Sequence, residues 1–326
     1  MTNVFIYQDP HPAHQLLADV LKCKGVSNRR EGLTKLPSIG RLMQASSLQE
    51  ELEKLAPKII ITENLSTDLL AGAIYKNKHP KTKLIGIIAD PKIYELKHAP
   101  LYDAIMTHWS LDKADLLMLG SDMMIDLVPH VFRDKTAKFF PPVFNLKKHL
   151  AVKAKFNKNL VFVGRLDEYK GVDLLYNFFV RQKYEWPNSV LYVAGKGKFE
   201  SMFLNSVCPV LRYLGRTSDS LFMGDVAAFY LALARCEPSG VAIVEAMAQG
   251  VVPIVSKGVG YKELVCQVDP RLVVEDIKGA ERIINHLFGN KREWEKLSKR
   301  CKVVAAGITE KNCVDMFKAA LSKVYK

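Results

Sequence analysis

The stretch NLVFVGRLDEYKGVDLL, residues 159–175, joins a short apolar run, a glycine with a basic neighbour and the start of a helical pattern. The run from Asn159 to Val163 predicts a buried strand, and the residues after Gly171 predict a helix. Ligands of open parallel sheets bind beyond the carboxyl ends of the strands. The turn between Gly164 and Gly171 is therefore a candidate site.

The same alternation recurs on both sides of this stretch. In the first half, strands are expected at 3–7, 58–62 and 83–89, helices at 14–23, 48–55 and 65–75, and short apolar strands at 104–107, 115–119 and 138–140. In the second half, strands are expected at 159–163, 190–194, 210–214 and 251–255, and helices at 173–181, 227–234, 241–248, 262–266, 279–287, 294–306 and 310–325. Short strands that are apolar on both faces predict parallel sheets covered by helices on both sides.

The length predicts two domains. A chain of 326 residues suits two domains of about 150 residues each better than one. Pro141 and Pro142 precede a polar, basic stretch that has little to bury, which indicates a boundary. We therefore expect an α/β protein with two Rossmann-like, doubly wound domains, residues 1–147 and 148–308, with a cleft between them and a closing segment, 309–326.

Composition and charge exclude several classes of protein. The chain is 48% hydrophobic and 25% charged, as in globular proteins, and no apolar run reaches the roughly 18 residues of a membrane span. Six scattered cysteines without a C-x-x-C pair argue against a zinc site and against a disulfide framework. With no signal peptide at the first strand, we expect a cytoplasmic protein. The net charge of +13 fits nucleic acid, an anionic membrane or a phosphorylated substrate, besides a merely solvated surface.

Three strands of the second half end in a glycine followed by a basic residue: Val163-Gly164-Arg165, Ala194-Gly195-Lys196 and Leu214-Gly215-Arg216. A glycine there lets a ligand approach the backbone, and the cation beside it can neutralise an anion. Arg165 and Lys170 stand five residues apart, before a helix whose amino end attracts anions. Arginine binds phosphate bidentately and lysine adds a point charge, so the pair suits a diphosphate.

A second polar group lies in the segment from Glu237 to Glu245. The two glutamates are separated by seven residues, so both carboxylates can face one side if the loop between them is tight. Ser239 and Gly240 would leave free N–H groups at the start of the following helix. Paired carboxylates can accept hydrogen bonds from sugar or ribose hydroxyls. They also fit the acid and base of a glycosidase, although hydrolysis of a glycoside needs no phosphate-binding turn.

Together these segments resemble the retaining GT-B glycosyltransferases of the large group 1 family, which includes sucrose synthase, glycogen synthase and bacterial mannosyltransferases. The resemblance covers about residues 159–265 and rests on four motifs in order: Gly164-Arg165…Lys170-Gly171, Gly195-Lys196-Gly197, Leu214-Gly215, and Glu237-Pro238-Ser239-Gly240…Glu245-Ala246-Met247-Ala248-Gln249-Gly250. It implies transfer of a sugar from a UDP- or GDP-linked donor to an acceptor hydroxyl, with retention. It also implies that no metal or other cofactor is needed and that the last helix packs on the first domain.

The resemblance implies a role for each matching residue. Arg165 and Lys170 would bind the diphosphate and stabilise the leaving group, as magnesium does elsewhere. Glu237 would lie beside the transferred sugar, Glu245 would hold the ribose, and Tyr213 would lie near the nucleobase. The expected donor site comprises Gly164, Arg165, Lys170, Gly195, Tyr213, Glu237, Ser239, Gly240, Val241 and Glu245.

The first half departs from the family's pattern. The family has a Gly-Gly loop where this chain has Gln8-Asp9-Pro10-His11-Pro12-Ala13-His14, and it often has a histidine where this chain has Asp90. Asp90 is a candidate general base, which would favour inversion, and His11 or His14 is a candidate for the missing polar group.

Other classes of function stay open. A GT-B sugar-nucleotide epimerase or phosphorylase would share the cleft, although the glycine, lysine and E-x7-E pattern is closer to the transferases. A basic nucleotide- or nucleic-acid-binding protein fits the positive charge, and a DNA glycosyltransferase would combine both properties. The acceptor is expected to be a glycan, a lipid or a protein, with nucleic acid as an alternative. A basic face would also suit peripheral contact with an anionic membrane.

Overall fold

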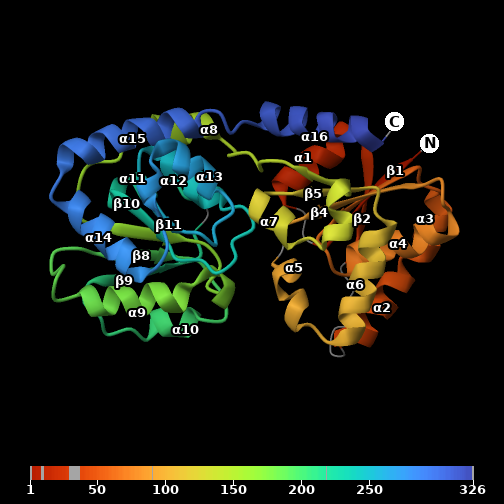
Figure 1. The fold of residues 1–326 in the computed structure, drawn as a ribbon, viewed down its shortest axis with the longest axis horizontal. Helices are drawn as coiled ribbons and strands as arrows, with labels where there is room; N and C mark the ends of the chain where they lie inside the picture. The colour runs from red at the N-terminus through yellow and green to blue at the C-terminus, as the bar shows by residue number, and fades with distance from the viewer. Residues whose placement is uncertain (1, 9–10, 29–36, 90, 218, 325–326) are drawn as a thin grey trace. The chain divides into compact units, whose positions relative to one another are not determined.

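The computed structural model describes residues 2–8, 11–28, 37–89, 91–217 and 219–324. The chain divides into two compact units (Figure 1). Unit 1 comprises Met1–Pro141 and Glu310–Lys326, and unit 2 comprises Pro142–Thr309. Each unit is built on one parallel six-stranded sheet, which confirms the expected α/β fold.

The sheet of unit 1 has the strand order β2-β1-β3-β4-β5-β6. Its strands are β1 (Asn3–Tyr7), β2 (Cys23–Ser27), β3 (Ile59–Glu63), β4 (Lys83–Ile88), β5 (Leu116–Leu119) and β6 (Thr136–Lys138). The chain runs from β1 to β2 at one side and then returns to β3 at the other side of β1. The direction of winding therefore switches between β1 and β3, and α/β proteins bind ligands at the carboxyl ends of strands at such a point.

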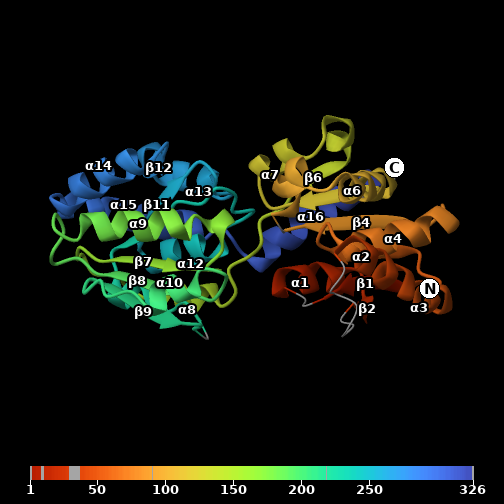
Figure 2. The same cartoon turned by 90° about the horizontal axis from the view of Figure 1, so that it is seen from below.

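Helices cover both faces of this sheet, as the two views in Figure 1 and Figure 2 show. On one face α1 (Pro12–Val20) packs against α16 (Glu310–Val324), and on the other α4 (Thr67–Lys78) packs against α2 (Pro37–Ser47) and α6 (Leu101–Lys113). The remaining helices of unit 1 are α3 (Gln49–Leu55), α5 (Lys92–Glu95) and α7 (Asp122–Leu127). Phe317 of α16 is fully buried in the core that contains Phe5 and Leu17. A buried side chain of this size contributes about 1.5–3 kcal/mol, so the last helix is an integral part of unit 1.

The sheet of unit 2 has the order β12-β11-β10-β7-β8-β9. Its strands are β7 (Leu160–Val163), β8 (Leu191–Ala194), β9 (Leu211–Gly215), β10 (Phe229–Ala232), β11 (Val252–Ser256) and β12 (Val273–Val274). Here the winding switches between β7 and β10. The loops that follow these two strands are therefore the expected place for a ligand.

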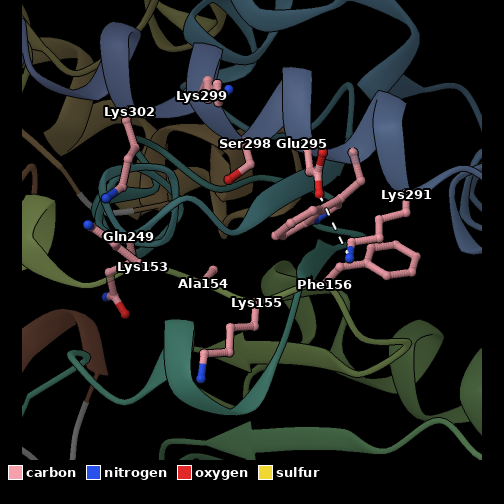
Figure 3. A pocket seen from close by; sticks show the side chains of 11 residues that line it. Lys153, Ala154, Lys155, Phe156, Gln249, Lys291, Glu295, Ser298, Lys299 and Lys302 are labelled. Atoms are coloured by element: carbon pink, nitrogen blue, oxygen red, sulfur yellow. Dashed lines mark ion pairs between the residues drawn. The ribbon is translucent and has the colours of Figure 1, made fainter.

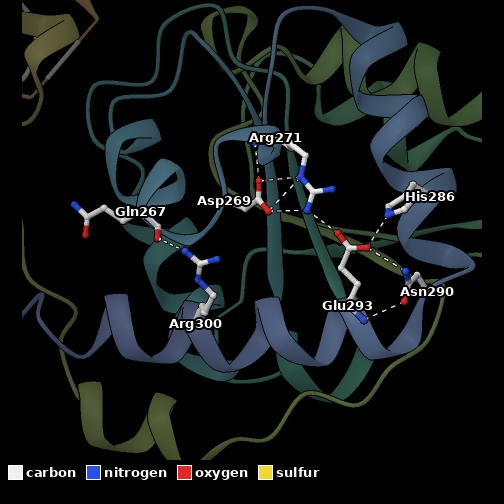
Figure 4. Close-up of polar contacts among 7 residues, drawn as sticks. All are labelled: Gln267, Asp269, Arg271, His286, Asn290, Glu293 and Arg300. Atoms are coloured by element: carbon white, nitrogen blue, oxygen red, sulfur yellow. Dashed lines mark hydrogen bonds and ion pairs between the residues drawn. The ribbon is translucent and has the colours of Figure 1, made fainter.

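The helices of unit 2 are α8 (Leu146–Ala151), α9 (Val172–Gln182), α10 (Glu200–Leu204), α11 (Met223–Val226), α12 (Val241–Gln249), α13 (Lys262–Val268), α14 (Ile277–Phe288) and α15 (Lys291–Ala305). Helix α12 packs against α8, α11 and α15. An ion-pair network at the surface links the end of α13 to α14 and α15 (Figure 4). In it Arg271 donates to Asp269 and Glu293, and Glu293 also faces His286. Exposed pairs of this kind add little stability, so the buried core holds these helices in place.

The structure corrects two expectations about local elements. The expected helix at 227–234 is wrong, because Phe229–Ala232 forms β10 between β7 and β11, with all four residues buried. Alanine and leucine favour a helix, but burial on both faces of a central strand outweighs that propensity. The expected strand at 104–107 is also wrong, because these residues lie inside α6. Within the described residues, no helix is long and apolar enough to cross a membrane.

Candidate active site

The expected donor-site residues of unit 2 lie at or after the carboxyl ends of four neighbouring strands. Gly164 and Arg165 follow β7, Gly195 follows β8, Tyr213 lies near the end of β9, and Glu237 follows β10. Parallel strands end at the same edge of a sheet. The fold therefore gathers residues that are more than 70 positions apart in the sequence at one edge, around the switch between β7 and β10.

Lys170 and Glu237 form an ion pair at this edge. Lys170 ends a 3₁₀ turn, and Gly171 follows it with a φ of 64°. The backbone of Glu237 is fixed on both sides: its N–H donates to the Gly258 carbonyl and its own carbonyl accepts from Gly260 N–H, both at 2.7 Å. The two side chains are 17% and 13% exposed, so they are held against each other but remain within reach of a ligand.

Arg235 joins the two loops that carry this pair, and the sequence did not single it out. Its guanidinium donates to both carboxylate oxygens of Asp173 at 2.7 Å. Its backbone N–H donates to the carbonyl of Tyr169 at 2.9 Å. A bidentate Arg–carboxylate contact fixes orientation as well as distance, so Arg235 sets the position of Lys170 relative to Glu237.

The two cations of the turn have different surroundings. Burial and the charge of Arg165 lower the pKa of Lys170 to about 7, and the charge of Asp167 opposes this shift. Arg165 is largely exposed, and its Nε donates to Asp167 Oδ2 at 2.7 Å. A buried ammonium group is costly unless it is paired. An incoming anion would therefore stabilise Lys170 more than it would a solvated lysine.

One of the glycines, Gly195, is required by the protein's own backbone. Gly195 has a φ of 143°, and a Cβ on it would lie 1.8 Å from the carbonyl oxygen of Gly164. The hydroxyl of Tyr213 lies 2.7 Å from the carbonyl oxygen of Gly195 and 2.9 Å from Glu200 Oε1. Burial raises the pKa of this hydroxyl to about 12. The ends of β7, β8 and β9 are thus locked together, which gives the site a rigid floor.

The amino end of α12 opens at the same edge. Gly240, with a φ of 101°, precedes the helix, and Val241 is its first residue. The loop before it is anchored by Tyr261, whose N–H donates to the carbonyl of the buried Ser239 at 2.8 Å. The first N–H groups of a helix have no partner within the helix and favour anions. This helix end therefore adds donors beside Glu237.

The two glutamates of the E-x7-E pattern engage different groups. Glu237 contacts Lys170, whereas Glu245, one turn into α12, accepts a hydrogen bond at 2.6 Å from the hydroxyl of Ser220. No local pattern predicted a role for Ser220, because it lies 25 positions before its partner.

Unit 1 has a polar group of its own at the switch between β1 and β3. Glu63, at the end of β3 and 2% exposed, lies 2.5 Å from Nδ1 of the buried His14 and accepts from the backbone N–H of His11 at 2.8 Å. Its other oxygen, Oε2, has no hydrogen-bond partner among the described residues. The candidate base Asp90 lies outside the described residues. Glu63 was not predicted as a site residue, because in the sequence it is only the polar residue at the end of an apolar strand.

A hollow of about 700 Å³ lies elsewhere in unit 2 (Figure 3). It is bordered by the segment that enters β7 and by the end of α12, at the amino ends of the strands. Its lining comprises Lys153, Ala154, Lys155, Phe156, Gln249, Lys291, Trp294, Glu295, Ser298, Lys299 and Lys302. This hollow is therefore separate from the edge that holds Lys170 and Glu237. Within the described part of the chain, no group of His, Cys, Asp and Glu residues is arranged to hold a metal ion.

Several solved structures share this fold over nearly the whole chain. HepE of Anabaena, in complex with UDP-glucose, has a TM-score of 0.76 at 15% identity and covers 99% of both chains. Sucrose-phosphate synthase from Thermosynechococcus elongatus has a TM-score of 0.71 at 15% identity and covers 99% of this chain and 88% of its own. WaaG, a glycosyltransferase involved in lipopolysaccharide biosynthesis, has a TM-score of 0.70 at 12% identity and covers 98% of both chains. At these identities the likeness shows the fold, which is GT-B.

The second half of the chain is that of a group 1 glycosyltransferase. Residues 147–304 match the family model described as glycosyl transferases group 1. This match, over nearly half of the chain, agrees with the resemblance that its motifs indicated. No curated protein sequence matches the chain.

Proposed function

We propose that this glycosyltransferase moves a sugar from a nucleoside-diphosphate sugar, UDP- or GDP-linked, to an acceptor hydroxyl, with retention and without a metal. The observation that supports this most is the contact between Lys170 and Glu237, beside Arg165 and the amino end of α12. Cations and free N–H groups suit a diphosphate, and a carboxylate next to them suits the hydroxyls of the sugar that it carries.

In this proposal the donor rearranges the ion pair. The diphosphate takes Lys170 as its partner, because two negative phosphates stabilise the buried ammonium group better than one carboxylate does. Glu237 is then free to accept hydrogen bonds from the transferred sugar. As the bond to the sugar breaks, Lys170, Arg165 and the N–H groups of α12 neutralise the charge that develops on the departing diphosphate.

The nucleoside would lie toward β9 and α12. Glu245 would hold the ribose hydroxyls, and the backbone near Tyr213 would face the base. UDP-glucose bound to HepE, which shares the fold, supports a uridine nucleotide as the first donor to test.

We infer that the acceptor binds unit 1, at the switch between β1 and β3. Glu63 supports this inference, because its buried Oε2 lacks a partner that an acceptor hydroxyl would supply. A glycan, a lipid or a protein acceptor fits, and peripheral contact with an anionic membrane and a cytoplasmic location stay predictions. The test is the Michaelis constant of each acceptor: Glu63→Gln is expected to raise it and to leave donor affinity unchanged.

Turnover of UDP-glucose and GDP-mannose with water as the acceptor tests the donor site. Lys170→Ala and Glu237→Ala are each expected to lower sugar release more than tenfold without loss of the fold. Lys278→Ala and Glu295→Ala, at exposed positions of unit 2, serve as matched controls. Near-normal turnover by both site variants would contradict the assignment. The anomeric form of the first product, read by NMR, tests retention, and isomerised donor without sugar release would indicate an epimerase instead.

A further inference from the structure

Glu245 belongs to a buried chain of hydrogen bonds that reaches well beyond the donor edge. The hydroxyl of Ser220 donates to Glu245 Oε2 at 2.6 Å. The backbone carbonyl of Ser220 in turn accepts from Gln249 Nε2 at 2.8 Å. Gln249 Nε2 also lies 3.1 Å from Nδ1 of His149. Ser220, Gln249 and His149 are all buried, and they come from a loop, from α12 and from α8.

The orientation of the Gln249 amide is settled by its neighbours. Its Oε1 accepts from the backbone N–H of Gly224 at 2.7 Å, and its Nε2 faces the Ser220 carbonyl. Turning the amide over would place two donors together at Gly224 and two acceptors together at Ser220. Gln249 is fully buried beside the hollow of unit 2 (Figure 3), so loss of these hydrogen bonds would leave buried polar groups without partners, which is costly.

This orientation also settles the state of His149. Because Gln249 Nε2 carries only N–H groups, Nδ1 of His149 must be the acceptor, and the ring is neutral with its proton on Nε2. Burial lowers the pKa of His149, which favours this neutral form, and the charges of Glu245 and Asp219 oppose the shift. Both hydrogen atoms of the Gln249 amide and its oxygen are thereby used within the network.

The network acts on one oxygen of Glu245 only. Ser220 engages Oε2, and none of the described residues engages Oε1. Because Gln249 pins the backbone of Ser220, the serine hydroxyl approaches Glu245 from a fixed direction. A carboxylate that is held at one oxygen presents the other at a fixed position, whereas a free glutamate samples several rotamers.

We propose that Ser220, Gln249 and His149 are positioning residues that orient Glu245 toward the ribose of the donor. Through Glu245, this network sets the preference for a nucleotide with ribose hydroxyls over the same nucleotide without them. The proposal rests on the proposed function, in which Glu245 accepts from the ribose hydroxyls. A residue that merely supports the fold would weaken every nucleotide alike. A residue that aims Glu245 weakens only nucleotides that carry those hydroxyls.

Calorimetric binding of UDP and GDP, each compared with its 2′,3′-dideoxy analogue, tests the proposal. For the nucleotide that binds better, Ser220→Ala is expected to raise the dissociation constant of the ribose form five- to tenfold and that of the dideoxy form less than twofold. Gln249→Met keeps the size of the side chain without its hydrogen bonds, and the same selective loss is expected. Ser220→Thr keeps the hydroxyl and is expected to restore the ribose preference.

Ser298→Ala is the matched control, because this serine also bonds near the end of α12, to the carbonyl of Gly250 at 2.7 Å, but does not contact the network. Its ribose preference is expected to equal that of the wild type. The positioning role would be overturned if Ser220→Ala weakened the binding of both nucleotide forms equally, or if it left the ribose preference unchanged. In either case, nucleotide binding by the wild type would still support the donor site. Failure of the wild type to bind either nucleotide would overturn both.

Discussion

Binding of a nucleoside diphosphate is expected to draw a proton onto Lys170. In the free protein, burial and the charge of Arg165 hold the pKa of this lysine at about 7. A diphosphate in contact with the ammonium group reverses both effects, because it replaces lost solvation and adds opposite charge. The pKa then returns to its ordinary value, roughly 10.4, or above it.

The size of the effect follows from these two values. At pH 8 a group with a pKa of about 7 is roughly one-tenth protonated, whereas the bound group is almost fully protonated, so binding takes up about 0.9 proton. At pH 6 the free group is already roughly nine-tenths protonated, and uptake falls to about 0.1 proton. Affinity is therefore expected to fall as the pH rises above 7, by up to about tenfold per pH unit.

Calorimetric titration with UDP at pH 8, in two buffers of different ionisation enthalpy, measures this uptake directly. At this pH the phosphates of UDP no longer titrate, because their second pKa is roughly 6. Lys170→Arg is the control, since arginine stays charged at every pH of the experiment. Uptake below about 0.2 proton in the wild type, or equal uptake by Lys170→Arg, would refute the assignment of a buried, low-pKa lysine to the diphosphate.

Three further outcomes are expected. Gly195→Ala should lower the free energy of unfolding, measured in urea, by about 3 kcal/mol or more, because its Cβ would meet the Gly164 carbonyl. Gly215→Ala, with open space around its Cβ, should lower the same free energy by only about 1–2 kcal/mol. Equal losses would count against a locked floor. Arg235→Lys should lower the free energy of unfolding by about 1–2 kcal/mol and slow turnover, since lysine cannot bind Asp173 bidentately. Unchanged turnover would contradict the positioning role of Arg235. Donor binding should be the same with EDTA, and a loss would indicate a metal.

The sequence was informative where one segment carries the whole signal. The strands β7, β8 and β11 of unit 2 could be predicted because each is a short apolar run, as buried parallel strands are. The turn from Gly164 to Gly171 could be predicted as a site because its cations follow a strand end directly. The strand β2 could not be predicted, since Lys24 and Gly25 interrupt its apolar run and only its pairing with β1 defines it. The prediction of a helix at 227–234 was wrong because the burial of β10 comes from tertiary packing, which the local sequence does not show.

The partners of the site residues were out of reach for a different reason. Arg235 lies 62 positions from Asp173, Glu63 lies 49 positions from His14, and Ser220 lies 25 positions from Glu245. Nothing in the local pattern of either partner predicts such a contact. The motifs thus predicted which residues would face a ligand, whereas the contacts that hold these residues in place emerged only with the fold.

Nucleotide binding to the wild type and to Lys170→Ala is the decisive test of a donor site at Lys170 and Glu237. The measurement is a thermal-shift and calorimetric screen of UDP, GDP and ADP and their sugar conjugates, with and without EDTA. We expect that one diphosphate binds tightly, that EDTA changes nothing, and that Lys170→Ala loses at least tenfold in affinity. Binding of no diphosphate, or undiminished binding by the variant, would contradict a donor site at Lys170 and Glu237 and would make duplex DNA and anionic vesicles the next ligands to test.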